Sequence, residues 1–151
     1  MHRSFFVGIA FLLGMASLPA HAGLLDGLGT CTLTVNASGT MRLAGDGKTL
    51  STTATGGLSA GMLLVGVNIT PELVFSAPTV VGPTGWPGSP KTEISIDTLS
   101  GTRTGFTSNA ITVRPGVLID TLTFQARVTN NDGFKAGNYT VNTTATCQSA
   151  T

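Results

Sequence analysis

The stretch VLIDTLTFQARV, Val117 to Val128, decides the fold class of this chain. Its apolar and polar residues alternate with a period of two, which places successive side chains on opposite faces of a β-strand. Asp120 falls on the inward phase, so we expect either a bend or bulge there or an acid near the end of a sheet. The other residues of the predicted inward face are Leu118, Leu122, Phe124, Ala126 and Val128.

Similar patterns recur on both sides of this stretch. The most apolar part, residues 62–69, predicts a buried strand rather than a helix because it is short and flanked by glycines. Gly45-Asp46-Gly47 predicts a hairpin turn, since Asp-Gly tolerates positive φ. Residues 77–91 contain four prolines and three glycines, which exclude a helix or a central strand. Further short strands are predicted within residues 31–36, 40–43, 72–75 and 92–99, before Arg114, and within 139–147.

The number and spacing of these segments predict an antiparallel β-sandwich or barrel. We expect eight to ten strands, with turns about every 8–12 residues and no helix. The composition agrees, because Thr, Gly, Val and Leu are abundant while charged residues make up only 10% of the chain. Without an internal repeat or a linker, residues 23–151 are predicted to form one β-sandwich domain.

The first 22 residues, MHRSFFVGIAFLLGMASLPAHA, have the three parts of a secretory signal peptide. His2 and Arg3 are basic, and the apolar core at residues 5–13 is too short to span a membrane. Ala20-His21-Ala22 provides a cleavage site, so we expect a signal peptide over residues 1–22 and a mature chain from Gly23. The predicted location is the periplasm, the outer cell surface or the medium, with no membrane span after cleavage.

Signal cleavage would remove both histidines, His2 and His21. The remaining basic and acidic residues balance at zero net charge, which gives no electrostatic footprint for nucleic acid. Nucleophilic catalysis that uses a Ser–His or Cys–His pair is excluded without an imidazole, and so are metal sites built on histidine.

Paired carboxylates are the remaining route to hydrolysis, with Glu93 and Asp97, or Asp120, as candidates. Glu93 and Asp97 are four residues apart in one strand and therefore about 13 Å apart, too far for a glycosidase pair. Each is more simply a solvated or strand-end charge. The oxygen-rich turns at residues 45–47 and 130–133 lack the dense acidic pattern of a calcium loop. We predict a non-enzymatic protein with no catalytic residue, metal or cofactor.

The two cysteines, Cys31 and Cys147, lie on the apolar phases of the first and last predicted strands. An exported chain can keep a disulfide, and only one pairing is possible within it. The bridge would close a loop of about 116 residues and tie both ends of the domain into the core. Two free buried thiols or an intermolecular bridge are the alternatives.

Trp86, the only tryptophan, lies in the Pro- and Gly-rich segment at residues 77–91. An exposed tryptophan on a loop can stack a sugar ring or insert into a protein partner, so Trp86 is a candidate partner-binding residue. The alternative is that it caps the open end of the sandwich beneath its own loop. The Thr-rich outward strand faces would form flat, uncharged surface that suits packing against neighbours.

The passage GFKAGNYTVNTTATC, residues 133–147, resembles the closing strand of bacterial pilin-like immunoglobulin-type sandwiches, in which a Gly-x-Tyr-Thr step enters an alternating strand. With CTLTVNASGTMRLAGDG, residues 31–47, and the signal, the chain is similar to small exported fimbrial-like proteins of Gram-negative bacteria. The resemblance implies an immunoglobulin-like sandwich with a structural or adhesive role at the cell surface. Its partners would be protein neighbours in an assembly, or a glycan.

Two features depart from the pilins of chaperone–usher systems. Those subunits carry a donor segment of alternating apolar residues, whereas GLLDGLGT, residues 23–30, does not alternate. Their disulfide lies in the early part of the fold, whereas a bridge here would join the first and last strands. Both departures favour a self-complete domain. Its alternative role is a monomeric periplasmic or secreted binding module that uses the Trp86 loop.

Overall fold

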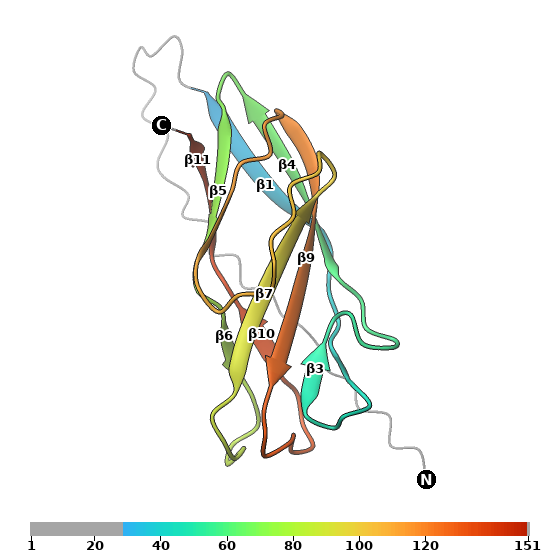
Figure 1. Ribbon diagram of the computed structural model, residues 1–151. Coiled ribbons are helices and arrows are strands. Elements are labelled where there is room, and N and C mark those ends of the chain that lie inside the picture. Colours follow the sequence, from blue (N-terminus) through green and yellow to red (C-terminus); the bar gives the residue numbers. More distant parts are fainter. Residues whose placement is uncertain (1–28, 151) are drawn as a thin grey trace.

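The computed structural model describes residues 29–150, and this part of the chain contains eleven strands and no helix (Figure 1). Every strand pair is antiparallel. The all-β, antiparallel prediction is therefore confirmed, with one strand more than the upper end of the expected range. The expected signal peptide, residues 1–22, lies outside the described residues.

The longest strand, β9 (Ile119–Thr129), is the centre of the larger sheet (Figure 1). One of its edges pairs with β7 (Lys91–Thr98). The other edge pairs first with β4 (Ala60–Val67) and then with β3 (Thr49–Ser51). The sheet continues beyond these strands with β1 (Thr30–Ala37) next to β4 and β2 (Arg42–Leu43) next to β3. Five strands are thus organised around β9 in a six-stranded sheet.

Thr52 fills the position between β4 and β3 on their shared edge of β9. Its backbone N–H donates to the Ala126 carbonyl at 3.0 Å. Its hydroxyl donates to the same carbonyl at 3.3 Å and accepts the Ala126 N–H at 3.1 Å. The residue is 3% exposed, so water does not satisfy these groups. One buried hydroxyl therefore allows two strands to share one edge of β9.

The second layer contains a three-stranded sheet and a two-stranded sheet. The larger has β5 (Pro71–Phe75) between β8 (Ile111–Val113) and β11 (Ala145–Ser149). The smaller pairs β6 (Thr79–Val81) with β10 (Thr140–Asn142). Along the chain, β6 comes directly after β5, and β10 comes directly before β11. The β6–β10 pair therefore continues the β5–β11 pair, with a register change of one residue between them.

Hydroxyl side chains bridge the break between these two sheets. Ser76 N–H donates to the Thr144 carbonyl at 2.9 Å, and Thr144 N–H donates to the Ser76 hydroxyl at 2.9 Å. The Thr143 hydroxyl donates to the Ser76 carbonyl at 2.8 Å. Side chains thus replace ladder hydrogen bonds at a bulge, and the last two strands stay together as one bent ribbon.

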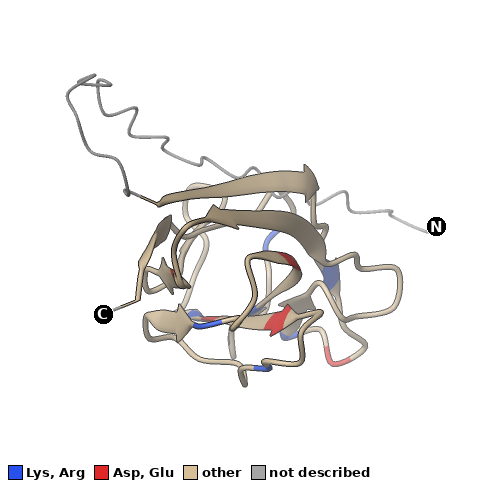
Figure 2. Ribbon diagram, turned by 90° about the horizontal axis from the view of Figure 1, so that it is seen from above, with Lys and Arg blue, Asp and Glu red and all other residues tan. Residues whose placement is uncertain are grey.

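The two layers face each other across one apolar core, in a sandwich-like arrangement (Figure 2). The rings of Phe75 from β5 and Phe124 from β9 meet across it, with centroids 6.4 Å apart. The inward phase predicted for the second half of β9 is confirmed, since Leu122, Phe124, Ala126 and Val128 are at most 1% exposed. Other core residues include Met41, Leu50, Met62, Leu64, Leu73, Ile94, Ile96, Val113, Tyr139 and Val141.

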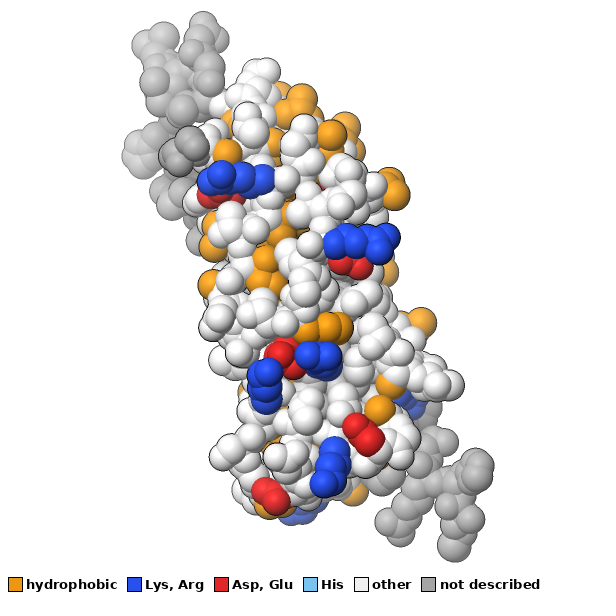
Figure 3. Space-filling model, in the orientation of Figure 1, with side chains coloured by type: hydrophobic (Ala, Val, Ile, Leu, Met, Phe, Trp, Pro, Cys, Tyr) orange, Lys and Arg blue, Asp and Glu red, His pale blue; other side chains and the backbone are white. Residues whose placement is uncertain are grey.

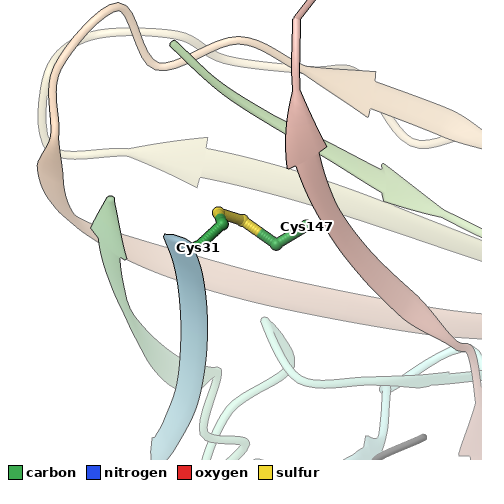
Figure 4. The surroundings of a disulfide bond; sticks show 2 residues. All are labelled: Cys31 and Cys147. Atoms are coloured by element: carbon green, nitrogen blue, oxygen red, sulfur yellow. A yellow bond between two sulfur atoms is a disulfide. The ribbon is translucent and has the colours of Figure 1, made fainter. Parts of the chain in front are cut away.

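Cys31 of β1 and Cys147 of β11 form a disulfide with their Cα atoms 5.7 Å apart (Figure 4). β1 is an edge strand of the first sheet and β11 is an edge strand of the second. The bridge therefore ties the two layers together along one side of the molecule. The prediction that one disulfide joins the first and last strands is confirmed.

The Gly45-Asp46-Gly47 turn joins β2 to β3, as predicted. Asp46 accepts the backbone N–H groups of Lys48 and Thr49 at 2.8 and 3.0 Å and the Thr49 hydroxyl at 2.8 Å. These bonds, chiefly the one from Lys48, lower the pKa of the Asp46 carboxyl. Gly47 has φ 67°, in the left-handed region that glycine adopts without a steric penalty. The turn thus holds itself with its own carboxylate.

Two expectations about burial are wrong. Leu118 does not point inward, because β9 begins only at Ile119 and the Leu118 side chain is 49% exposed. The apolar run at residues 62–69 is not buried on both faces, because β4 covers the core with one face only. Its outward residues Leu63 and Val67 are 37% and 50% exposed. Of the two alternatives given for Asp120, a bend or bulge and an acid near the end of a sheet, the second holds, because Asp120 is buried near the end of the larger sheet.

Replacing both cysteines, Cys31→Ser with Cys147→Ser, should lower the free energy of unfolding by about 4 kcal/mol. The unfolded chain then regains the entropy of a loop that the bridge closes across 116 residues. Urea titration of the oxidised protein and the double variant measures the difference. Hydrogen exchange should show β1 and β11 losing protection together, and a loss confined to one of them would contradict the tie.

Thr52→Val should lower the free energy of unfolding by about 1–3 kcal/mol, because the isosteric side chain leaves the buried Ala126 N–H without a partner. Thr52→Ser keeps the hydroxyl and should retain most of the stability. Thr121→Val on the exposed face of β9 is the control, with an expected change within about 0.5 kcal/mol. Equal urea midpoints for Thr52→Val and wild type would refute the role of the hydroxyl.

Candidate functional site

Trp86 lies in the loop between β6 and β7, beside the turn that precedes β10. Its ring stacks on Phe134, with centroids 5.6 Å apart, and meets Tyr139 edge-on at 4.8 Å. Its indole N–H donates to the Gly133 carbonyl at 3.2 Å. The side chain is half-buried and packs against the core. Trp86, Phe134 and Tyr139 form an aromatic cluster that closes this end of the sandwich.

Polar contacts hold the two loops around the aromatic cluster together. The buried Asn130 amide donates to the Pro87 and Gly133 carbonyls at 2.8 and 2.7 Å. Lys135 Nζ donates to the Thr84 carbonyl at 3.0 Å. The Tyr139 hydroxyl donates to the Lys135 carbonyl at 2.7 Å, and burial raises the pKa of Tyr139. The Trp86 loop is therefore fastened to the turn before β10.

The surroundings of Trp86 support the capping alternative. Phe134 lies against one face of the indole, and the N–H already has a carbonyl partner. A Cβ at Gly82 would lie 2.7 Å from the Trp86 ring and 2.8 Å from the Tyr139 ring, so a glycine is needed there. Binding of a sugar or a protein by Trp86 stays a prediction.

Glu93 is not the solvated charge that the sequence suggested, because it is only 4% exposed. Its carboxylate pairs with Arg127, its cross-strand neighbour on β9, at 2.7 Å and with Lys91 at 2.8 Å. The Arg127 guanidinium also lies over the Phe106 ring, 4.3 Å from its centroid. The hydrogen bond from Arg127 is the main cause that lowers the pKa of Glu93. A carboxyl held ionised in this way is unsuited to donate a proton as a general acid.

Asp120, the third carboxylate considered from the sequence, has its oxygens occupied by neighbours. Its Oδ2 accepts the Ser100 hydroxyl at 2.5 Å, and its Oδ1 accepts the N–H groups of Ser100 and Thr121 at 3.2 and 2.8 Å. The Ser100 hydroxyl also contacts the Pro115 carbonyl at 3.0 Å. These bonds fasten the loop after β7 to the start of β9, which is a structural role.

The charged side chains described above act as ties between strands. Glu72 of β5 pairs with Arg114 and accepts the Gln148 side-chain amide of β11 at 2.8 Å. Its pKa is lowered by Gln148 first and by Arg114 next. Figure 3 shows side chains of opposite charge in contact on one face of the molecule. Within residues 29–150, no three side chains of His, Cys, Asp or Glu come together as metal ligands.

The outer face of the larger sheet carries aliphatic side chains near the start of β9. Leu63, Val65 and Val67 point outward from β4, because the alternate residues Met62 and Leu64 are buried. Val65 lies directly opposite Ile119, which is 66% exposed. Leu99 is 83% exposed and donates its backbone N–H to the Thr121 carbonyl. It therefore continues the row of residues that runs across the sheet from Leu63 to Thr121. We call Leu63, Val65, Val67, Leu99 and Ile119 the aliphatic face.

Threonines border the aliphatic face on the edge strand β1. Thr30, Thr32 and Thr34 are exposed and lie opposite Val67, Val65 and Leu63 in the register of the sheet. Neither β1 nor β4 contains a charged residue. The surface is therefore uncharged across these two strands and apolar at its centre.

Sequence reasoning anticipated flat Thr-rich surface but missed its aliphatic centre. The available signal was the unbroken apolar run of β4, together with Val117, Leu118 and Ile119 at the start of the alternating stretch. An unbroken apolar run is typical of a strand that is covered on both faces. In the described part of the chain, the second layer covers only the inner face of β4, so the outward residues Leu63 and Val67 stay exposed.

No model of a known family, no curated protein and no solved structure matches this chain. The part of the chain that the structure describes contains no helix long and apolar enough to cross a membrane.

Glu93→Gln should reduce the acid sensitivity of the fold. The lowered pKa of Glu93 means that its ionised form stabilises the folded state above the unfolded pKa of about 4.3, and that this contribution is lost as the pH falls through the folded pKa. At pH 7 the variant should lose at most about 1 kcal/mol, since Arg127 and Lys91 are 40% and 63% exposed. Urea titrations between about pH 7 and pH 3 measure how the free energy of unfolding of wild type and variant changes with pH. The same pH dependence in both proteins would contradict this role of the Glu93 carboxylate.

Trp86→Ala should lower the free energy of unfolding by about 2 kcal/mol, less than a fully buried tryptophan loses, because the indole is half-buried. Trp86→Phe keeps a ring for the stack on Phe134 and should lose less. The control is Leu99→Ala, at a residue 83% exposed, with an expected change within about 0.5 kcal/mol. Unchanged thermal stability of Trp86→Ala would argue against capping and for a binding role.

Proposed function

We propose that this chain is an exported, non-enzymatic structural or adhesive protein of the cell surface, with a fimbrial-like immunoglobulin-type sandwich. The observation that carries the proposal is the aliphatic face with its border of threonines, an uncharged and exposed surface on the outer side of the larger sheet. Such a surface suits contact with another protein more than it suits solvent alone. The proposed location is the periplasm, the outer surface or the medium.

The disulfide supports export, because such bonds persist in oxidising compartments outside the cytoplasm. The carboxylates support a non-enzymatic role. Glu72, Glu93 and Asp120 are each bonded to partners that fix neighbouring strands. A structural subunit needs a rigid scaffold with open surface, and these ties provide the rigidity.

The alternative function is a monomeric binding module that uses the Trp86 loop. The observation in its favour is that the Trp86 side chain stays partly exposed although it is packed against Phe134. A partly exposed indole can bind a glycan or a protein side chain. The aliphatic face would then have no part in binding.

Fractionation of cells that produce the full chain tests the proposal. We expect the protein, with Cys31 and Cys147 oxidised, in material sheared from the cell surface and in complexes larger than a monomer. A monomer found only in the periplasm or the medium would favour the binding module. Glycan binding abolished by Trp86→Ala and kept by Leu99→Ala would favour it further. Reduced protein retained in the cytoplasm would overturn both functions.

A further inference from the structure

We propose that the aliphatic face is a self-association surface, and that its occupant is the same face of a second copy of this chain. The inference deepens the proposed function and rests on it, because a surface assembly would provide the high local concentration of this chain that a weak contact needs. The face is the outward side of β1, β4 and the start of β9, with Leu99 continuing the row beyond β9.

The registers define how the side chains are arranged on this face. One row across the sheet runs Thr34, Leu63, Thr121 and then Leu99. The next row runs Thr32, Val65 and Ile119, and a third pairs Thr30 with Val67. Aliphatic residues thus occupy most of the middle of the face, with Thr121 between Leu63 and Leu99, and further hydroxyl groups line its β1 border. A flat pleated surface of this kind can pack against another sheet at about 10 Å, with side chains interdigitating.

The charge pattern favours a second copy as the occupant. In a two-fold symmetric contact the same patch of both copies meets, so a patch that carries charge of one sign would meet that same sign. β1 and β4 contain no charged residue. The first charged neighbour across the sheet is Asp97, one row beyond the aliphatic face, opposite Thr123. Self-contact therefore buries aliphatic groups without opposing like charges.

The composition of the aliphatic face argues against other occupants. A glycan is commonly held by an aromatic platform, and an anionic membrane attracts basic side chains. The aliphatic face has neither, since it consists of leucine, valine and isoleucine with threonine around it. Aliphatic side chains with β-branched neighbours are instead the residues that fill the interior between two packed sheets.

The size of the face sets the expected strength. Strands lie about 4.8 Å apart and rise about 3.3 Å per residue, so three strands over about six residues cover roughly 300 Å². Both copies together would bury less than the about 1,200 Å² of stable complexes. Association should therefore be weak and reversible in solution. It would become extensive where many copies are held together at a surface.

Sedimentation velocity of the purified, oxidised protein tests the inference over roughly 1 µM to 1 mM, the range in which weak complexes dissociate. The wild type should shift from monomer to dimer as its concentration rises. Raising the salt from about 0.05 to 0.5 M should not weaken the dimer, because the contact is uncharged. The double variant Leu63→Lys with Ile119→Lys should raise the dissociation constant at least tenfold.

The matched control is Leu58→Lys with Val81→Lys, which adds the same charge at exposed apolar residues that are 63% and 60% accessible and lie off the aliphatic face. It should dimerise as the wild type does. Ile119→Thr keeps a β-branched side chain and should weaken the dimer severalfold, so it decides the question if the lysine variant fails to fold. Circular dichroism and thermal unfolding check the fold of each variant.

A wild type that stays monomeric at every concentration would overturn the inference, even if fractionation finds the protein at the cell surface. Dimerisation that survives both Leu63→Lys with Ile119→Lys and Ile119→Thr would also overturn it, as would a control that loses dimerisation equally. Binding of the monomer to phosphatidylcholine vesicles, abolished by the same variants, would assign the face to lipid and overturn self-association. The inference can thus fail while the proposed function stands.

Discussion

Strand β9 hydrogen-bonds along both edges and buries one complete face, and the rest of the fold depends on this strand. Its inward residues meet the second layer, and its two edges organise the other strands of the larger sheet. One edge serves two partners, β4 and β3, and the Thr52 hydroxyl satisfies Ala126 where neither strand reaches. A single buried polar side chain thus permits a sheet that branches around its central strand.

Three kinds of contact hold the second layer to this sheet. Apolar packing centred on Phe75 and Phe124 fills the interior, and the Cys31–Cys147 bridge joins two edge strands at one side. The aromatic cluster closes one end of the core. Paired charges do not join the layers; they lie on the sheets, where Glu93 and Glu72 each connect neighbouring strands. This division leaves the carboxylates with structural tasks.

The same arrangement explains where open surface remains. The second layer covers only one side of β4 and β9, so the outward residues of an apolar run lie exposed next to the threonines of β1. Burial of apolar area is the dominant favourable term in association. Because the aliphatic face is uncharged, contact with the same face of a second copy does not bring like charges together. The proposed surface role and the proposed self-association both follow from this one uncovered sheet face.

The sequence by itself determined the all-β class, the inward phase of β9 from Leu122 onward and the turn at Asp46, and it allowed only one disulfide within the chain, Cys31–Cys147. These features depend on local alternation, on the φ preferences of single residues and on there being only two cysteines. Only the tertiary structure decided that Glu93 is buried, that Leu118 and Leu63 are exposed and that Trp86 stacks on Phe134. The reason is physical: burial and pairing are set by segments distant along the chain, such as Thr52 and Ala126, 74 residues apart, and alternation within one strand does not specify which layer covers which face.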